Sequence, residues 1–355
     1  MDRGGLESML MNYYRHIDRA MLQFDFLVHR QERVAFDDEI EALGGIIYRL
    51  PRLVPWSRSY LSALARFFDE HPDYKIIHVH QDCLSSVILK AAEQHDVPVR
   101  IAHSHNASQD KNLKYPIKLW YKRSIPKYAT NLFACGKDAG DWMFGGASFR
   151  IINNAIDVEA YTYALPKRRK IRQQLGLENE FTIGHVGRFC QQKNHSFLLE
   201  SFAALLKKEP NSVLLLVGGG KDMPKMQAKA QALGITEHVC FLGVRSDVAD
   251  LMQAMDVFVF PSLYEGLPVT MVEAQAAGLP CIISDKVPTE CIITEGLVDV
   301  LPLSAGPEAW AEKILEKRVF PRADRHDEIA ANGFDITTEA VKLQEFYLEA
   351  IKGTS

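Results

Sequence analysis

The stretch that decides the fold covers residues 260–280 and reads FPSLYEGLPVTMVEAQAAGLP. The apolar run Val257–Phe260 that leads into it predicts a buried strand. Pro268 suits the first turn of a helix, because a missing N–H group costs nothing there. Gly278 and Pro280 then end that helix. The stretch therefore predicts a strand, a loop and a helix in succession.

Two glutamates stand out in this stretch, Glu265 on the predicted loop and Glu273 within the predicted helix. Helical spacing places Glu273 on one face with Val269 and Ala276, so its carboxylate is expected to be partly buried and to need partners. The free N–H groups at the helix start suit a phosphate. A ligand with hydroxyl groups at both ends and phosphates between them, such as a nucleotide sugar, would use all of these features. Taken alone, the two glutamates also fit an ordinary solvated helix.

The segments around these glutamates (Pro-Ser, Glu-Gly-Leu-Pro, and Glu-Ala followed by Gly-Leu-Pro) resemble the donor-site signature of retaining, nucleotide-sugar-dependent glycosyltransferases with the GT-B fold. The similarity is greatest to their fourth sequence family, glycosyltransferase group 1, which includes exopolysaccharide and capsule enzymes. The resemblance implies an α/β protein with two Rossmann-like, doubly wound domains facing a cleft. It also implies that a sugar, favoured as a UDP-sugar, moves with retention to the hydroxyl of a glycan or lipid-linked acceptor.

The resemblance assigns roles to particular residues. Glu265 holds sugar hydroxyls and Glu273 accepts hydrogen bonds from the ribose. Arg188 and Lys193 match the family's Gly-Arg…Lys element, whose cations stabilise the departing diphosphate. The chain has no Asp-x-Asp pair, which metal-dependent GT-A enzymes use, so neither a metal nor another cofactor is expected. The remaining substrate contacts in this region are Gly187, Val244, Gly266 and Leu267.

Bulk properties are those of a globular protein with two domains. The chain has 355 residues, 47% hydrophobic and 24% charged, with a formal net charge of −4, which gives no reason to expect a nucleic-acid partner. The six cysteines are scattered, as is typical of free thiols in a reducing cytosol. The chain shows no apolar run of membrane-spanning length and no apolar signal core, so a cytoplasmic location is expected.

Strands and helices alternate through the first half, which predicts a parallel sheet with helices on both faces. The resemblance places an N-terminal, acceptor-side domain at residues 1–160 and a nucleotide-sugar-binding domain at 161–337. A final helix at 338–352 is expected to pack back on the first domain. The predicted strands of the first domain are Phe24–Val28, Ile46–Leu50, Ile76–Val79, Val99–Ala102, Leu132–Ala134 and Arg150–Ile152.

Gly4 and Gly5 predict a glycine turn that enters a helix and lets the backbone approach the diphosphate. In the resembling family an apolar strand precedes such a turn, whereas this chain begins only a few residues earlier. We hypothesise that the first strand is missing, through a misplaced start or a truncation. A shorter but intact domain is the alternative.

Histidines occur at the ends of two predicted strands, His78 and His80 after one and His103 and His105 after the next. Ligands bind at the carboxyl ends of parallel strands. The second pair resembles the family's strand end near the donor sugar, which assigns His103 to that sugar. A zinc site is the alternative, disfavoured because no carboxylate or cysteine completes a familiar spacing. A structural role is favoured for His78 and stays open for His80.

The segment 111–127 carries lysines, an arginine and three aromatic residues but no acidic residue. Such a composition suits an anionic membrane surface, here the inner face of the cytoplasmic membrane, and equally a solvated helix face. The resemblance favours the membrane, because such enzymes often use lipid-linked acceptors. Two alternative functions remain: a nucleotide-sugar epimerase, for which we identify no acid and base, and a non-catalytic partner subunit with the GT-B fold.

Overall fold

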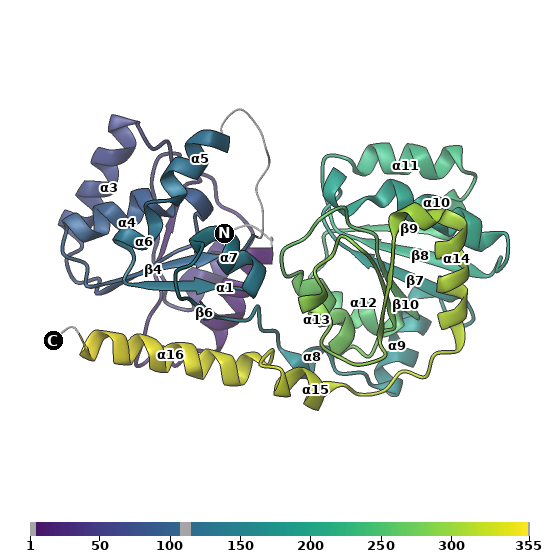
Figure 1. Ribbon diagram of the computed structural model, residues 1–355. Coiled ribbons are helices and arrows are strands. Elements are labelled where there is room, and N and C mark those ends of the chain that lie inside the picture. Colours follow the sequence, from purple (N-terminus) through teal and green to yellow (C-terminus); the bar gives the residue numbers. More distant parts are fainter. Residues whose placement is uncertain (1–4, 107–114, 354–355) are drawn as a thin grey trace. The chain divides into compact units, whose positions relative to one another are not determined.

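The computed structural model describes residues 5–106 and 115–353. Contacts divide the chain into two compact units (Figure 1). Unit 1 comprises Met1–Ala155 and Ile336–Ser355, and unit 2 comprises Ile156–Asp335. The first boundary thus lies slightly before the predicted one between residues 160 and 161. Each unit is an α/β structure with parallel strands, in agreement with the predicted fold class.

Unit 1 contains the strands β1 (Phe26–Val28), β2 (Ile47–Arg49), β3 (Ile76–Val79), β4 (Val99–Ser104), β5 (Asn131–Ala134) and β6 (Arg150–Ile151). Its helices are α1 (Gly5–His16), α2 (Asp37–Ala42), α3 (Arg58–Glu70), α4 (Ser85–Gln94), α5 (Tyr115–Lys122), α6 (Ile125–Tyr128), α7 (Lys137–Phe144) and α16 (Ile336–Lys352). The strands lie where the sequence predicted them, with ends that differ by a residue or two.

The parallel pairing in unit 1 is divided between two sheets. One has the order β1-β2 and the other the order β3-β4-β5-β6, whereas the sequence predicted one sheet. The two sheets are separate because no described strand pairs with both β1 and β3. Gly4 lies outside the described residues, and the hypothesis that the strand before it is missing stays a hypothesis. The core of this unit joins α1 to α16 through residues such as Met11, Tyr13 and Leu343.

Unit 2 contains the strands β7 (Phe181–Val186), β8 (Ser212–Val217), β9 (Val239–Gly243), β10 (Val257–Phe260), β11 (Cys281–Ser284) and β12 (Val298–Leu301). Its helices are α8 (Val158–Tyr161), α9 (Leu165–Leu175), α10 (His195–Leu206), α11 (Met223–Ala232), α12 (Val248–Ala254), α13 (Val269–Ala276), α14 (Gly306–Glu316) and α15 (His326–Ala331). The strand, loop and helix predicted from residues 257–280 are β10, its loop and α13.

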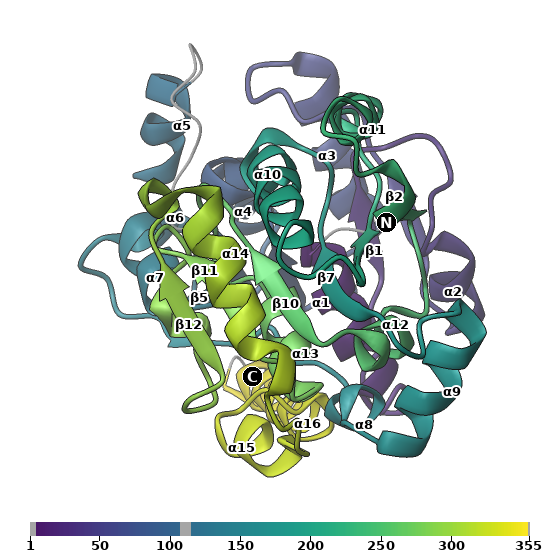
Figure 2. The same ribbon diagram turned by 90° about the vertical axis from the view of Figure 1, so that its right-hand side faces the viewer.

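The sheet of unit 2 is parallel, with the order β12-β11-β10-β7-β8-β9 (Figure 2). Side chains alternate across it, so Leu214 and Leu216 join a core with α10, α11 and α14. Leu215 and Val217 join the core on the other face, with α9, α12 and α13. The chain runs outward in both directions from β7 and β10, which are neighbours. This doubly wound order creates a switch point, where ligands bind beyond the carboxyl ends of the strands.

A buried arginine holds the C-terminal end of α13 in place. The Arg322 guanidinium donates to the carbonyls of Gln253 and Met255, at 2.9 and 2.8 Å, and to that of Ala277. The Gln253 carbonyl lies in the last turn of α12, and those of Met255 and Ala277 directly follow α12 and α13. Carbonyls at such helix ends lack partners within the helix. Burial lowers the pKa of Arg322 to about 9. The arginine therefore ties the segment after α14 to the helix that carries Glu273.

No helix in the described part of the chain combines the length and the apolar composition that crossing a bilayer requires.

Gly278→Ala should destabilise unit 2 more than Gly234→Ala does. Both glycines have left-handed backbones, with φ of +62° and +70°, where a Cβ atom costs about 1–2 kcal/mol. Only at Gly278 would that Cβ also meet a backbone atom, the Ala323 carbonyl oxygen, at 2.2 Å. We expect the urea midpoint of Gly278→Ala to fall clearly below that of Gly234→Ala. Equal midpoints would show that the backbone at Ala323 moves away from the new Cβ atom without lowering the free energy of unfolding.

Candidate functional site

The loops after β7 and β10 form the centre of the candidate site, because these strands flank the switch point of unit 2. The first loop runs through Gly187 and Arg188 to a short 3-10 helix, Gln191–Lys193, that precedes α10. The second runs from Pro261 to Pro268 and precedes α13. Adjacent parallel strands bring their carboxyl ends together, so residues distant in sequence meet here.

Lys193 and Glu265 form an ion pair across these two loops. The Lys193 Nζ atom lies 2.7 Å from Glu265 Oε1, and the side chains are only 14% and 6% exposed. The same Nζ lies 4.5 Å from the centre of the Phe260 ring. Gln192 Nε2 donates to Glu265 Oε2 at 3.3 Å and to the Tyr264 carbonyl at 2.9 Å. The resemblance assigned separate roles to the two charged residues, and the structure makes each the other's counterion.

Arg188 differs from Lys193 in being exposed. It has no hydrogen bond or ion pair with another described residue. A guanidinium offers several N–H donors in a fixed fork that suits phosphate oxygens. The site therefore has one cation that is already neutralised and one that is available to an anion.

Glu273 is held by Tyr161, whose hydroxyl donates to Glu273 Oε1 at 2.9 Å. Burial raises the pKa of Glu273 to about 7, and the Tyr161 hydrogen bond acts in the opposite direction. The sequence predicted a partly buried carboxylate in need of partners, but it did not identify Tyr161 on α8. Tyr161 and Gln192 are the residues that sequence reasoning missed. Neither lies in a recognisable motif, although Gln192 adjoins Lys193.

The other substrate contacts predicted for unit 2 are Gly187, Val244, Gly266 and Leu267, which lie on loops that follow its strands. A Cβ atom on Gly187 would come within 2.9 Å of His185 Nε2, and one on Gly219 within 2.9 Å of Val244. The Gly187 amide donates to the Val217 carbonyl at 2.9 Å, so that amide is occupied within the sheet. Val244 directly follows β9 and is exposed. Gly266 and Leu267 lie between Glu265 and the start of α13.

The predicted site residues of unit 1 that the structure describes are Gly5 and His103. Gly5 begins α1 and is exposed. His103 is 2% exposed and belongs to a cluster with His78, His80 and His105. Its Nδ1 atom lies 3.1 Å from His78 Nε2, while His80 Nδ1 lies 2.8 Å from His105 Nε2. His78, expected to be a lone structural histidine, is therefore part of a four-ring cluster.

Burial keeps these rings uncharged. It lowers the pKa of His78 and of His105 to about 3, and together with neighbouring histidines it lowers those of His80 and His103 well below the usual value. The Nε2 atom of His103 is buried without a hydrogen-bond partner. An unpaired buried polar group costs about 1–3 kcal/mol, so this nitrogen is a candidate contact for a ligand.

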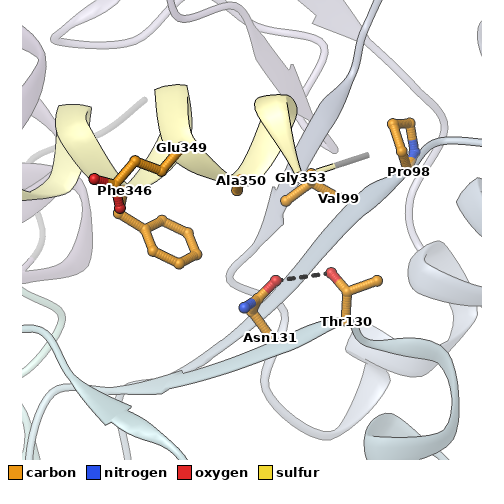
Figure 3. A pocket seen from close by; sticks show the side chains of 8 residues that line it. All are labelled: Pro98, Val99, Thr130, Asn131, Phe346, Glu349, Ala350 and Gly353. Carbon is orange, nitrogen blue, oxygen red and sulfur yellow. Dashed lines mark hydrogen bonds between the residues drawn. The ribbon is translucent and has the colours of Figure 1, made fainter. Parts of the chain in front are cut away.

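A separate pocket of about 400 Å³ lies between α16 and the sheet of unit 1 (Figure 3). Its lining includes Val99 and Asn131, the first residues of β4 and β5, together with Phe346 of α16. These are the amino ends of the strands, whereas ligands of parallel sheets bind at the carboxyl ends. The pocket therefore does not coincide with the candidate site.

Comparisons with known proteins bear on the family and the fold of the chain. The family described as "Glycosyl transferases group 1" matches residues 167–317, and "Glycosyltransferase Family 4" matches residues 3–160. The putative glycosyltransferase EpsF of Bacillus subtilis (strain 168) is 36% identical over 98% of this chain and 94% of its own. This chain belongs to the group 1 glycosyltransferases. The two Rossmann-like units of this glycosyltransferase form the GT-B fold, as the resemblance implied.

Other similar proteins extend the comparison. The UDP-Gal:alpha-D-GlcNAc-diphosphoundecaprenol alpha-1,3-galactosyltransferase of Escherichia coli is 26% identical over 78% of this chain and 76% of its own. The crystal structure of Anabaena Alr3699/HepE in complex with UDP and glucose superposes with a TM-score of 0.79. It covers 97% of this glycosyltransferase and 96% of its own chain at 21% sequence identity, which supports the shared fold.

The raised pKa of Glu273 predicts a pH-dependent stability for the glycosyltransferase. The folded pKa is about 7 and the ordinary value 4.5, so the folded protein binds more protons than the unfolded chain between these limits. The contribution of Glu273 to the free energy of unfolding therefore falls as pH rises through this window. Glu273→Gln should abolish this loss. Between pH 4.5 and 8, its free energy of unfolding should therefore rise relative to that of wild type by up to about 3 kcal/mol.

Urea unfolding at both pH values measures this difference. Glu295→Gln, at an exposed carboxylate of the same unit, is the control and should leave the pH profile as in wild type. A Glu273→Gln profile parallel to that of wild type would contradict the assignment.

Proposed function

We propose that this glycosyltransferase transfers a sugar from a nucleotide diphosphate sugar, with UDP as the favoured nucleotide, to an acceptor hydroxyl with retention and without a metal ion. The observation that carries the proposal is the pairing of Lys193 with Glu265 at 2.7 Å at the switch point of unit 2. The exposed Arg188 follows β7 there and pairs with no other residue that the structure describes. The UDP and glucose complex of HepE supports this donor class.

The cations would replace a metal ion at the diphosphate. Arg188 meets the phosphates first, since it has no counterion to release among the described residues. Lys193 then divides its charge between Glu265 and the phosphates, while Glu265 accepts hydrogen bonds from sugar hydroxyls. Donors held in place before the reaction stabilise developing charge without reorganisation. This arrangement supports a reaction in which protein side chains neutralise the leaving group.

Other residues would position the donor. Glu273, supported by the Tyr161 hydroxyl at 2.9 Å, accepts hydrogen bonds from the ribose. Main-chain groups at Val244 contact the base, and the Nε2 atom of His103, buried without a partner, contacts the donor sugar. Each of these contacts is part of the proposal.

The acceptor in this proposal is a lipid-linked glycan in exopolysaccharide or capsule synthesis. The E. coli relative, named for a diphosphoundecaprenol substrate, supports that class. We further propose that the protein is cytoplasmic and binds the inner face of the membrane through residues 111–127. Within the described part of this segment, α5 exposes Ile117 and Trp120 beside basic residues. Lys122 in turn places its Nζ 4.4 Å from the centre of the Trp142 ring.

Arg188→Ala should reduce donor-dependent nucleotide release by about 10²–10³-fold, because one group that stabilises transition-state charge is lost. Release is measured on a panel of UDP- and GDP-sugars with a membrane lipid extract as acceptor. Arg188 is a cleaner test than Lys193, whose removal would also leave Glu265 buried without its counterion. Lys207→Ala, at an exposed cation of the same unit, is the control.

Intact turnover in Arg188→Ala would overturn the role of this arginine. Interconversion of nucleotide sugars without acceptor would indicate an epimerase instead. Nucleotide binding without release from any donor in the panel would indicate a non-catalytic subunit.

Trp120→Ala should weaken sedimentation of the protein with vesicles rich in anionic lipid at low salt. Trp120 is 63% exposed and Trp56 is 62% exposed, so Trp56→Ala is a matched control that removes an equally exposed ring elsewhere in unit 1. An exposed aromatic ring beside lysines contributes both apolar and interfacial contacts. Equal pelleting of the two variants, or no pelleting of wild type, would refute the membrane surface.

A further inference from the structure

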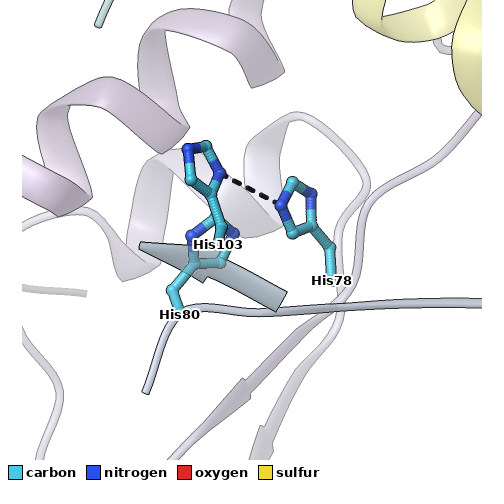
Figure 4. A group of neighbouring side chains, drawn as sticks. All are labelled: His78, His80 and His103. Carbon is cyan, nitrogen blue, oxygen red and sulfur yellow. Dashed lines mark hydrogen bonds between the residues drawn. The ribbon is translucent and has the colours of Figure 1, made fainter. Parts of the chain in front are cut away.

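We propose that the histidine cluster of unit 1 is a binding site for a borderline divalent transition metal ion of the zinc class, with His78, His80 and His103 as ligands (Figure 4). One ligand atom from each residue lies within 4.8 Å of the others. This ion is distinct from the proposed sugar transfer, in which Arg188 and Lys193 of unit 2 neutralise the diphosphate. The proposal goes beyond that function and does not depend on it.

The cluster is built by two His-x-His sequences on neighbouring strands. Side chains two residues apart point to the same face of a strand, which pairs His78 with His80 and His103 with His105. Strands β3 and β4 are parallel, and their register places Val79 opposite Ala102. His80 and His103 come next on their strands, and their ring centres lie 5.1 Å apart. Strand geometry alone therefore gathers the imidazoles.

Hydrogen bonds select the nitrogen atoms that can bind the ion. His78 Nδ1 lies 2.6 Å from the Tyr347 hydroxyl, and His80 Nδ1 lies 2.8 Å from His105 Nε2. A histidine that uses one nitrogen in such a bond presents the other to a metal, with its orientation fixed. His78 and His80 would therefore bind through Nε2.

His103 is the ring of the cluster whose hydrogen bonding is least complete. Its Nδ1 contacts His78 Nε2 at 3.1 Å, and its Nε2 is buried with no partner. A neutral imidazole has one N–H donor and one acceptor nitrogen. Whichever tautomer His103 adopts, one buried nitrogen stays unsatisfied. A metal ion between the rings, bound by His78 Nε2 and His103 Nδ1, would replace their single N–H···N contact by bonds to two lone pairs. His103 Nε2 would then carry the ring's proton and stay available for the proposed sugar contact.

The ligand type indicates the class of metal. Uncharged imidazoles suit zinc, copper, nickel and iron, whereas calcium and magnesium prefer oxygen. Three histidines with an open fourth position form a known kind of zinc site. Through Tyr347, which lies on α16, the ion would connect β3 and β4 to the last helix of unit 1. Binding should therefore protect this unit against unfolding.

The test is titration of the full chain, purified without a histidine tag, with Co²⁺, whose visible absorption reports four-coordinate binding. We expect one tightly bound Co²⁺ per chain, displaced by Zn²⁺. His80→Gln and His78→Gln should weaken Co²⁺ binding at least tenfold. Tyr347→Phe, which removes only the outer hydroxyl, should weaken it about 10–100-fold. His238→Gln changes a histidine of unit 2 and should bind as wild type does.

Circular dichroism checks that the variants are folded, and Tyr347→Phe keeps the test valid if a histidine variant is not. Absence of stoichiometric Co²⁺ binding by wild type would overturn the proposal. Unchanged affinity in His80→Gln and Tyr347→Phe would do the same, because the ion would then lie elsewhere. Each result is independent of nucleotide release, so the metal site and the proposed transfer succeed or fail separately.

Discussion

The ion pair between Lys193 and Glu265 is the constraint on which the candidate site depends. Both side chains are nearly buried, and a charge taken out of water needs a counterion close by. Neither residue can be removed without leaving the other uncompensated, a loss of about 3–5 kcal/mol for buried pairs. The neighbouring strands β7 and β10 bring the two loops together, so the doubly wound order of the sheet is what makes the pair possible.

Glu273 is also a partly buried carboxylate, but its described partner is a hydroxyl group and not a cation. Burial raises its pKa to about 7, and the hydrogen bond from its described partner, the neutral Tyr161 hydroxyl, opposes this rise without cancelling it. A carboxylate that is incompletely satisfied in the folded protein is ready to accept donors from a ligand. The site thus combines Glu265, which has a counterion, with Glu273, which has none among the described residues, and with the cation Arg188, which is likewise unpaired within the described part of the chain. Such differences in compensation favour a ligand that carries both hydroxyls and negative charge.

The histidine cluster of unit 1 arranges its buried polar groups without charge. Burial makes the protonated form of each histidine unfavourable, so the rings of His78, His80, His103 and His105 pair with one another and with Tyr347. The contacts within this cluster leave the Nε2 atom of His103 without a hydrogen-bond partner. Buried polarity is therefore handled by ion pairing at Lys193 and Glu265 and by neutral imidazoles in the histidine cluster.

The sequence by itself determined the strand and helix order, the GT-B fold and the family, because apolar runs, glycine and proline stops and the motif around Glu265 and Glu273 are local signals. It also placed Arg188 and Lys193 on a loop after a strand. Only the tertiary structure decided that Lys193 pairs with Glu265, that Tyr161 supports Glu273, and that the strand-end histidines form one cluster. These contacts join residues that are far apart in the chain, and their existence depends on which strands are neighbours. Strand order and register are properties of the packed sheet, and no local pattern encodes them.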